Sequence, residues 1–312
     1  MDIVKAIIVA IVEGLTEYLP ISSTAHMGFT AALLGMEETE YLKMFQVSIQ
    51  FGAILSIVVL YWKKFFDFSN FNFYIKLACA VVPALILGKL FDDKIEAVLG
   101  NQIVISCVLV LGGVVLLFVD KWFDNKEKID NEKDISIKKA VTIGFWQCLA
   151  MMPGTSRSAA SIIGGMSQGL SRKASAEFSF FLAVPTMMAV TLYSVFIKTW
   201  GEGMPNAQKG YEMILASTEN IMVFIIGNIV AFIVAMISTV IGAFGGAWAD
   251  KLGRFRKGSA AAQRSVQQAA ASDAVWSPER LTEYAASIFG KFQRDWQQMD
   301  VASIRTYTTQ RY

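Results

Sequence analysis

Five long apolar runs, almost free of charged residues, are the feature that most limits how this chain can fold. Each run approaches the ~20 residues that an α-helix needs to cross ~30 Å of hydrocarbon. Composition agrees, because 54% of the 312 residues are hydrophobic and only 17% are charged. The sequence therefore predicts an all-α integral membrane protein with about five full membrane spans, near 44–62, 73–91, 103–119, 178–197 and 221–248.

Two further apolar segments, 3–12 and 140–152, are too short to span a membrane, and each runs into a cluster of polar residues, Gly and Pro. Irregular backbone survives at membrane depth only where protein or a wet cavity satisfies its polar groups. We therefore predict two re-entrant helical hairpins. The first segment leads into carboxylates and lacks a small-residue cleavage site, so we expect it to stay in the mature chain.

The first hairpin carries two carboxylates, Glu13 and Glu17, one helical turn apart. An ionised group inside a membrane is costly, so both must face a partner, a metal ion or a water-filled cavity. Residues four apart share one helix face, where this pair would hold a divalent cation, Mg²⁺ or Ca²⁺, or divide the work between metal ligand and general base. The alternative is a structural ion pair or a solvated helix end.

Hydroxyl groups follow at Ser22, Ser23 and Thr24, and the only histidine of the chain follows at His26. A hydroxyl here either acts as a nucleophile or bonds the free backbone groups of a broken helix. His26 is either a general acid or base or a satisfied polar residue, and we favour the catalytic role. Both pairs of alternatives stay open at this point.

The second hairpin contains the run Pro-Gly-Thr-Ser-Arg-Ser, which begins at residue 153. Gly154 allows a tight turn, Ser156 and Ser158 offer hydroxyls, and Arg157 offers a rigid fork of donors. Together with exposed backbone amides these are the parts of a phosphate-binding site. Only two arginines precede residue 250, against sixteen lysines, which indicates that Arg157 serves bidentate geometry. A snorkelling or carbonyl-capping arginine is the alternative.

The two hairpins belong to an internal duplication with an offset of 133 residues. The repeat halves cover about 1–62 and 140–197. One half carries the carboxylates and the other carries the arginine, so two pseudo-symmetric loops would build one asymmetric phosphate site. Three pairs of residues coincide at this offset: Pro20 with Pro153, Ser23 with Ser156, and Phe45 with Phe178.

Lysine placement predicts the orientation of the spans, because lysine-rich loops lie on the cytoplasmic side. Traced from two such loops, the spans 44–62 and 178–197 run in opposite directions. The sequence therefore predicts an inverted-topology repeat, whose hairpins enter from opposite faces and meet near the midplane, where such folds place their sites. The lysines that define the two loops are Lys63, Lys64 and Lys76, and Lys121, Lys126, Lys128, Lys133, Lys138 and Lys139.

Other polar residues have supporting roles in this prediction, or none. Gln50 and Glu177 lie at the long spans that follow the hairpins, where we expect them to hydrogen-bond to site residues, with Glu177 as a partner for Arg157 or Arg172. The three cysteines lack metal-type spacing and are expected to be inert. A net charge of +2 gives no indication of nucleic-acid binding.

The motifs closely resemble those of the bacterial undecaprenyl-diphosphate phosphatase family, also called the bacitracin-resistance family, over about residues 1–235. The family's arginine motif adds Ser161 to the candidate phosphate-binding residues. Ala25, Ala159 and Ser161 stand where many relatives have Gly, Gly and Thr, which removes no functional group. The matching runs are Glu-Gly-Leu-Thr-Glu-Tyr-Leu-Pro-Ile-Ser-Ser-Thr-Ala-His at 13–26, Pro-Gly-Thr-Ser-Arg-Ser at 153–158 and Ala-Glu-Phe-Ser-Phe at 176–180.

The resemblance implies an enzyme that hydrolyses the C55 isoprenyl diphosphate to the monophosphate carrier used for peptidoglycan and other envelope polymers. It also implies a divalent cation, an active site on the outer face of the bacterial cytoplasmic (inner) membrane, and a homodimer as one form of assembly. Arg157 and hairpin amides would clamp the diphosphate, while Glu17 and Glu13 hold the cation. Two routes stay open: Ser23 as nucleophile with His26 as its base, or a metal-bound water that Ser23 positions.

A different class of function fits the same architecture. Inverted repeats with broken helices at the midplane are typical of transporters, and the same arginine could bind the headgroup of undecaprenyl phosphate in transit. A transporter needs neither a nucleophile nor a metal. The combination of Glu13, Glu17, Ser23 and His26 therefore favours hydrolysis.

The polar segment 249–312 departs from this pattern, and we expect a tail of foreign or uncertain origin beside a membrane domain at 1–248. Basic-residue usage switches from sixteen lysines and two arginines before residue 250 to three lysines and seven arginines after it. Residues 275–312 weakly resemble the start of a Tim44-like domain, and the final membrane helix of the phosphatase family is missing. The pattern predicts a linker or a loose helix at 259–272, and an amphipathic helix at 277–300. It also predicts a cytoplasmic C-terminus after a basic cluster at Lys251, Arg254, Arg256 and Lys257.

Overall fold

The computed structural model divides the chain into two units, Met1–Ile241 and Gly242–Tyr312. It describes residues 1–67, 71–99, 101–123, 129–131, 134–202 and 207–242, together with the single positions 280 and 283. Several predicted features lie outside the described residues. They are the end of the fifth span at 243–248, the linker and amphipathic helix of the tail, the Tim44-like resemblance, and Lys126, Lys128 and Lys133 of the basic loop.

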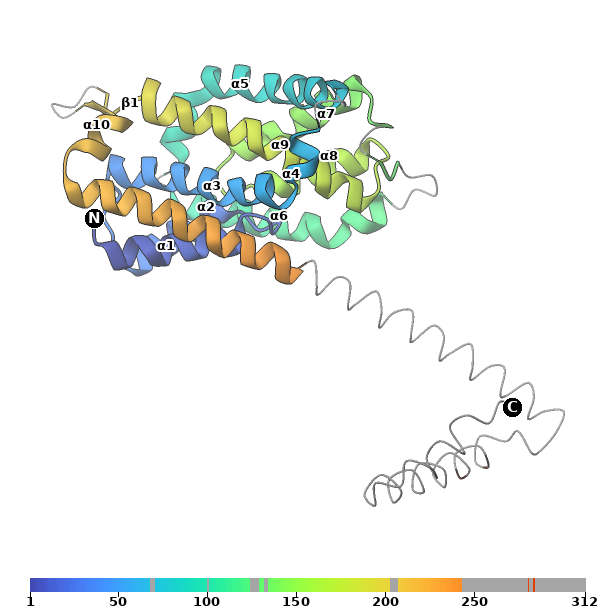
Figure 1. Ribbon diagram of the computed structural model, residues 1–312, viewed down its shortest axis with the longest axis horizontal. Coiled ribbons are helices and arrows are strands. Elements are labelled where there is room, and N and C mark those ends of the chain that lie inside the picture. Colours follow the sequence, from blue (N-terminus) through green and yellow to red (C-terminus); the bar gives the residue numbers. More distant parts are fainter. Residues whose placement is uncertain are drawn as a thin grey trace. The chain divides into compact units, whose positions relative to one another are not determined.

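The first unit is built from helices, as the apolar runs predict (Figure 1). Its described residues contain one small sheet, in which β1 (Thr199–Trp200) pairs antiparallel with β2 (Gln208–Lys209). The helices in chain order are α1 (Ile3–Thr16), α2 (Ser23–Leu33), α3 (Glu40–Leu60), α4 (Trp62–Phe65), α5 (Phe71–Leu99), α6 (Gln102–Trp122), α7 (Ile137–Gln147), η2 (Cys148–Met151), α8 (Arg157–Ser167), α9 (Arg172–Leu192), η3 (Tyr193–Ile197), α10 (Gly210–Leu215) and a last helix, Thr218–Gly242.

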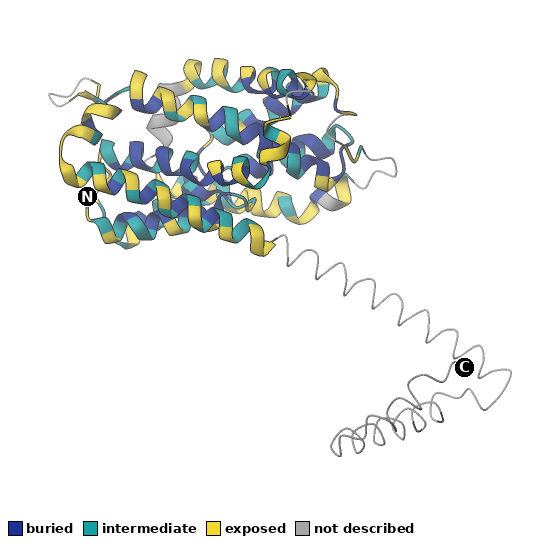
Figure 2. Ribbon diagram, in the orientation of Figure 1, coloured by how far each residue is buried: buried dark blue, intermediate teal, exposed yellow. Residues whose placement is uncertain are grey.

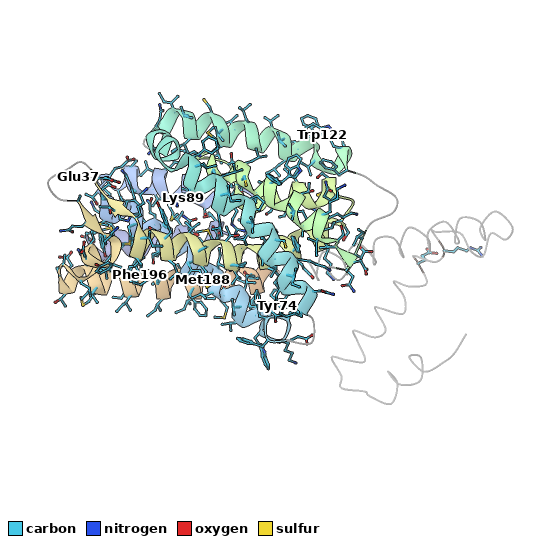
Figure 3. The ribbon with its side chains drawn as sticks, turned by 90° about the horizontal axis from the view of Figure 1, so that it is seen from above. Glu37, Tyr74, Lys89, Trp122, Met188 and Phe196 are labelled. Carbon is cyan, nitrogen blue, oxygen red and sulfur yellow. The ribbon has the colours of Figure 1, made fainter. Side chains whose placement is uncertain are left out.

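Five helical segments of the described chain are long and apolar enough to cross a membrane, which confirms the predicted number of spans. Their outward faces carry exposed apolar side chains, while buried residues gather on the inward faces (Figure 2). Met188 and Phe196 are among these exposed side chains (Figure 3). An apolar surface of this extent fits hydrocarbon rather than water. The five segments are Glu40–Leu60, Phe71–Phe91, Gln102–Val119, Arg172–Ile197 and Thr218–Gly242.

The internal duplication is visible in the order of the helices. The set α1, α2 and α3 recurs as α7, α8 and α9, and the starts of the second set follow those of the first by 132 to 134 residues. Helices α2 and α8 are both 11 residues long, and α3 and α9 are both 21 residues long. In each set a broken helical hairpin therefore leads into one long span.

The two long spans of the repeat pack against each other in opposite directions (Figure 1). Lys64, just after α3, forms an ion pair of 3.1 Å with Glu177 near the start of α9. At the other end, Thr191 of α9 donates a hydrogen bond of 3.5 Å to the carbonyl of Val47, near the start of α3. The end of one span thus lies beside the start of the other, as an inverted repeat requires.

The core between these helices is apolar and tightly packed. Phe181 of α9 is fully enclosed by edge-on contacts with the rings of Tyr61, Phe65 and Phe73. Farther along α5, Gly144 of α7 comes so close that a Cβ at this position would overlap the carbonyl oxygen of Ala80. Contacts of this kind hold the second hairpin, α7 to α8, at a fixed depth beside α5.

Candidate functional site

The carboxylates lie at the break of the first hairpin, where α1 ends and α2 has not yet begun. Glu13 is fully buried in the last turn of α1, and Glu17, at its C-terminal cap, is almost as buried. Both carboxylate oxygens of Glu13 lack a hydrogen-bond partner. An unpartnered buried carboxylate is unfavourable when ionised, so this position calls for a positive group.

The arginine lies at the corresponding break of the second hairpin. Gly154, with φ +94°, turns the chain after η2, and a Cβ there would lie only 2.5 Å from the carbonyl oxygen of Ile105. Ser156 then caps α8, because its Oγ accepts a hydrogen bond of 3.2 Å from the backbone N–H of Ala159. Arg157 is therefore fixed as the first residue of α8, with its guanidinium free to reach outward from the helix start.

The two breaks meet directly. Arg157 Nη2 lies 2.7 Å from Glu17 Oε1, and the side chains of this ion pair are only 13% and 5% exposed. A second bond joins the hairpins nearby, where Ser158 Oγ donates to the carbonyl of Leu19 at 3.1 Å. Arg157 Nη1 donates to the carbonyl of Ser179 at 3.4 Å, which ties the guanidinium to α9 as well. The carboxylates and the arginine predicted from separate motifs thus lie in one site.

Ser23 completes this arrangement from the first residue of α2. Its Oγ donates a hydrogen bond of 2.6 Å to Glu17 Oε2, while the other oxygen of the same carboxylate faces Arg157. His26 is placed differently, because its Nδ1 lies 2.9 Å from the backbone carbonyl of Ser22. The acceptor of the hydrogen bond from the Ser23 hydroxyl is therefore Glu17. The sequence-based scheme had assigned this role to His26.

Ser22 has an unusual backbone conformation at the start of α2. Its φ of +63° lies in the left-handed region, and no other non-glycine residue of the described chain has a positive φ. Its side chain does not cap α2, and its buried Oγ has no hydrogen-bond partner. A non-glycine residue in this region is strained, and such strain is typical of functional sites.

Two helix starts lie beside the ion pair, at Ser23 and at Arg157, which both contact Glu17. In α8 the N–H of Ala159 is already bonded to Ser156 Oγ. The start of α2 at Ser23 has no side-chain cap, and α8 starts at Arg157 itself. A helix N-terminus carries a partial positive charge and orphan N–H donors, which bind anions such as phosphate. A buried hydroxyl, a guanidinium and these two helix starts give the site the chemistry of a phosphate-binding centre.

Other predicted phosphate ligands hold the hairpins together in this structure. The hydroxyls of Ser156 and Ser158 lie 3.0 Å apart, and that of Ser158 also binds the first hairpin. Ser161 Oγ lies 2.6 Å from Ser179 Oγ and donates to the carbonyl of Arg157 at 2.9 Å. Thr24 is half-buried in the first turn of α2, next to Ser23. These serines therefore order the breaks around Arg157.

The two residues expected to support the site lie farther out. Glu177 forms its ion pair with Lys64, and the acid that pairs with Arg157 is Glu17, so of the two partners predicted for Glu177 the structure gives Arg157 to another acid. Pairing of Glu177 with Arg172 stays a prediction. Gln50 is half-buried on α3, and the structure gives it no polar contact among the described residues. Both residues lie on the long spans, and their contacts depend on which helices pack beside these spans. The sequence alone does not show that packing.

Sequence reasoning missed the group that anchors the tip of the first hairpin. Tyr18 OH donates to the carbonyl of Ala53 at 2.7 Å and lies 2.7 Å from Ser56 Oγ on α3. Its ring meets Phe180 of α9 edge-on, with the ring centres 5.4 Å apart. A tyrosine next to Glu17 and a serine inside an apolar span are the sequence signals that could have indicated this contact.

A cation site of protein ligands alone is not present in the part of the chain that the structure describes, since no three His, Cys, Asp or Glu side chains cluster there. Two carboxylates, however, fit a hard cation. Mg²⁺ is often held by one or two carboxylates together with the phosphates of a substrate. The two unpartnered oxygens of Glu13, one turn from Glu17, match a site in which the protein supplies two carboxylates and the substrate supplies the other ligands.

Comparisons with known proteins agree with this chemistry. The protein family described as "Bacitracin resistance protein BacA" matches residues 6–243. A protein of Porphyromonas gingivalis is 48% identical over 253 residues, and proteins of Flavobacterium psychrophilum and Flavobacterium johnsoniae are 47% and 44% identical over 238 residues. Each match covers 76% of this chain and 85% of the relative, and each relative is named undecaprenyl-diphosphatase.

Proposed function

The chain belongs to the bacitracin-resistance (BacA) family and is an undecaprenyl-diphosphatase, and we propose that it hydrolyses its substrate where the two hairpins meet. The products are undecaprenyl phosphate, the recycled lipid carrier of cell-wall synthesis, and inorganic phosphate. The observation that carries this proposal is the Arg157–Glu17–Ser23 contact between two helix starts. A transporter is not favoured, because the relatives are named as phosphatases and the site holds a hydroxyl bound to a carboxylate.

Substrate binding would begin at Arg157. The diphosphate carries more negative charge than one carboxylate, and its oxygens match the guanidinium fork, so it would compete with Glu17 for Arg157. The uncapped backbone amides at the start of α2 would bind the remaining oxygens. Glu17 would then lose its ion pair with Arg157 and keep its hydrogen bond from the Ser23 hydroxyl.

Glu17 already accepts the hydrogen bond of the Ser23 hydroxyl. In one route, Ser23 Oγ attacks the terminal phosphorus, its proton passes to Glu17, and the bond to the bridging oxygen breaks, so that undecaprenyl phosphate leaves. Water then hydrolyses the phosphoserine. In the other route, water attacks the phosphorus in a single step, and Ser23 orients it between Glu17 and the phosphate. His26, one turn along α2, would serve as an acid for the leaving group in either route.

A divalent cation, Mg²⁺ or Ca²⁺, would bind between Glu13 and Glu17. Bound there, it would neutralise phosphate oxygens and so ease attack by an electron-rich nucleophile. What supports this assignment is the burial of Glu13 and its two unpartnered oxygens. Holding the cation would give the buried carboxylate of Glu13 a role that its contacts with the described residues do not.

The chain is a multi-pass membrane protein of a bacterial family. We place it in the cytoplasmic (inner) membrane with its site open to the outer face, because the lysine-rich loops are expected on the cytoplasmic side. The diphosphate headgroup would then enter from the outer leaflet. A homodimer stays a prediction from the family resemblance.

The proposal is tested by phosphate release from undecaprenyl diphosphate with purified protein in detergent, with and without a chelator. Arg157→Ala and Glu17→Gln should each lower kcat/KM by about 10³-fold, in line with the loss of a group that stabilises transition-state charge. Arg172→Ala is the matched control, because it removes the other arginine of the membrane unit and should retain activity. Full activity in Arg157→Ala would overturn the assignment of the site.

Ser23 decides between the two routes. A phosphoserine trapped by acid quench in the wild-type protein, together with inactive Ser23→Ala, would establish the covalent route. Retained turnover in Ser23→Ala, with no phosphoprotein after quench, would establish direct attack by water.

A further inference from the structure

The last helix, Thr218–Gly242, lies outside both repeats and both motifs, yet it contacts the turn that carries the carboxylates. Ser238 Oγ lies 3.1 Å from the carbonyl oxygen of Gly14 and 3.0 Å from that of Ala235 in its own helix. Gly14 sits between Glu13 and Glu17 in the sequence. One hydroxyl of the last helix therefore reaches the backbone of the active-site turn.

The carbonyl that Ser238 contacts is one that α1 cannot satisfy by itself. The last four carbonyls of a helix lack regular intrahelical partners. In α1, the carbonyl of Glu13 accepts from the N–H of Glu17 at 2.9 Å, and that of Thr16 accepts from the N–H of Leu19 at 3.1 Å. The carbonyl of Gly14 is served from outside by Ser238. The last helix thus supplies a cap to the turn that holds both carboxylates.

The backbones of the two helices also touch at this point. A Cβ on Gly14 would lie 2.8 Å from the carbonyl oxygen of Ala231 and 2.9 Å from the backbone nitrogen of Ala235. Contacts with backbone atoms cannot be relieved by a side-chain rotation. The distance between α1 and the last helix is therefore fixed by close packing. The hydrogen bond of Ser238 in addition orients the Gly14 carbonyl toward the last helix.

A second polar contact fixes the last helix along its own axis. Asn228 Nδ2 donates to Ser48 Oγ of α3 at 3.0 Å, and Asn228 closely approaches Gly52 of the same helix. Asn228 precedes Ser238 by ten residues, or about 15 Å along the helix at 1.5 Å per residue. The last helix is thus anchored to α3 through Asn228 and to the active-site turn through Ser238.

From these contacts we propose that Ser238 is a positioning residue for catalysis, which acts by holding the Gly14 carbonyl and through it the orientation of Glu13 and Glu17. This proposal rests on the proposed function, because it assigns to Ser238 an effect on the reaction carried out by these carboxylates. Loss of the Ser238 hydroxyl leaves the turn packed but free to rotate. A displacement of a fraction of an ångström at such a turn is enough to slow a reaction that depends on alignment.

The experiment compares Ser238→Ala with Thr239→Val in steady-state hydrolysis and thermal unfolding. Thr239 is the matched control, because its hydroxyl makes an intrahelical bond of 2.8 Å to the same carbonyl of Ala235 and no hydrogen bond to the described residues of α1. Ser238→Ala should lower kcat about five- to tenfold with KM within about twofold of wild type, as expected for the loss of one aligning hydrogen bond. Ser238→Thr keeps the hydroxyl and should restore most of kcat, and Thr239→Val should match the wild-type protein.

Wild-type kcat in Ser238→Ala would overturn the proposal. An equal loss in Ser238→Ala and Thr239→Val, or a loss that Ser238→Thr does not restore, would also overturn it, because helix packing would then explain the effect. Failure of the proposed function looks different: the wild-type protein would release no phosphate, or Arg157→Ala would remain active.

Discussion

Arg157 and Glu17, separated by 140 residues in the sequence, form an ion pair of 2.7 Å that joins the two hairpins of the repeat. Both side chains are largely buried. A buried ion pair is a poor source of stability, because the desolvation of two charges offsets their attraction. Its role here is chemical, since it holds a guanidinium and a carboxylate next to each other in the site, inside an apolar protein.

The geometry of the guanidinium leads to the first prediction. Arg157→Lys keeps the charge but loses the donor fork that reaches Glu17 and the carbonyl of Ser179 at once. We expect kcat/KM to fall by about 10²-fold or more, because an ammonium cannot reproduce bidentate phosphate contacts. Phosphate release at saturating and limiting substrate measures this loss. Near wild-type kcat/KM in Arg157→Lys would show that charge alone is sufficient.

Glu13 should show opposite effects on stability and activity. Glu13→Gln removes a carboxylate that has no hydrogen-bond partner, so the melting temperature without divalent cation should stay the same or rise. Phosphate release should fall, and so should the increase in melting temperature that Mg²⁺ or Ca²⁺ causes in the wild-type protein. A chelator should have little effect on the melting temperature of the variant. An unchanged cation-induced shift in Glu13→Gln would place the cation elsewhere.

The strained conformation of Ser22 gives a prediction about backbone rather than side-chain chemistry. Ser22→Gly accepts a φ of +63° without strain, so it should retain stability within ~1 kcal/mol. Ser22→Val places a β-branched residue in this region and should destabilise the protein by about 1–2 kcal/mol and reduce turnover. Thermal unfolding in detergent and phosphate release measure both effects. Equal stability of the two variants would contradict the role assigned to this conformation.

Tyr18 should matter for stability more than for chemistry. Tyr18→Phe keeps the ring against Phe180 but leaves the buried hydroxyl of Ser56 without its partner, at a cost of about 1–2 kcal/mol. Tyr211→Phe is the matched control, since the hydroxyl of Tyr211 bonds only the exposed Glu212 and its loss should leave the melting temperature unchanged. Similar melting temperatures for the two variants would show that the hairpin tip is held by packing alone.

Much of this architecture could be predicted from the sequence, because its signals are local. A membrane span is a matter of length and hydropathy, and the offset that aligns Pro20 with Pro153 also aligns the helices of the two repeats. The residues of the site were predicted for a similar reason. Glu17, Ser23 and Arg157 are polar groups inside apolar sequence, and burial of such groups needs an explanation.

The partners of these residues could not be predicted in the same way. Glu177 was a plausible acid for Arg157, but it lies near the start of α9 beside Lys64, and only the packing of α3 on α9 decides this. The acceptor of the Ser23 hydroxyl depends on the turn between α1 and α2, and the contact of Ser238 depends on the approach of a helix from outside the repeat. These are contacts between distant segments, and no periodic pattern encodes them.

The most direct test of the account is a double-mutant cycle on kcat/KM for hydrolysis of undecaprenyl diphosphate, with Glu17→Gln, Arg157→Ala and the two combined. If the two hairpins form one catalytic unit, the double variant should be within about threefold of the weaker single variant, because each single substitution already disables the unit. Losses that multiply in the double variant would show that Glu17 and Arg157 act independently, and would contradict a single site at the meeting of the hairpins.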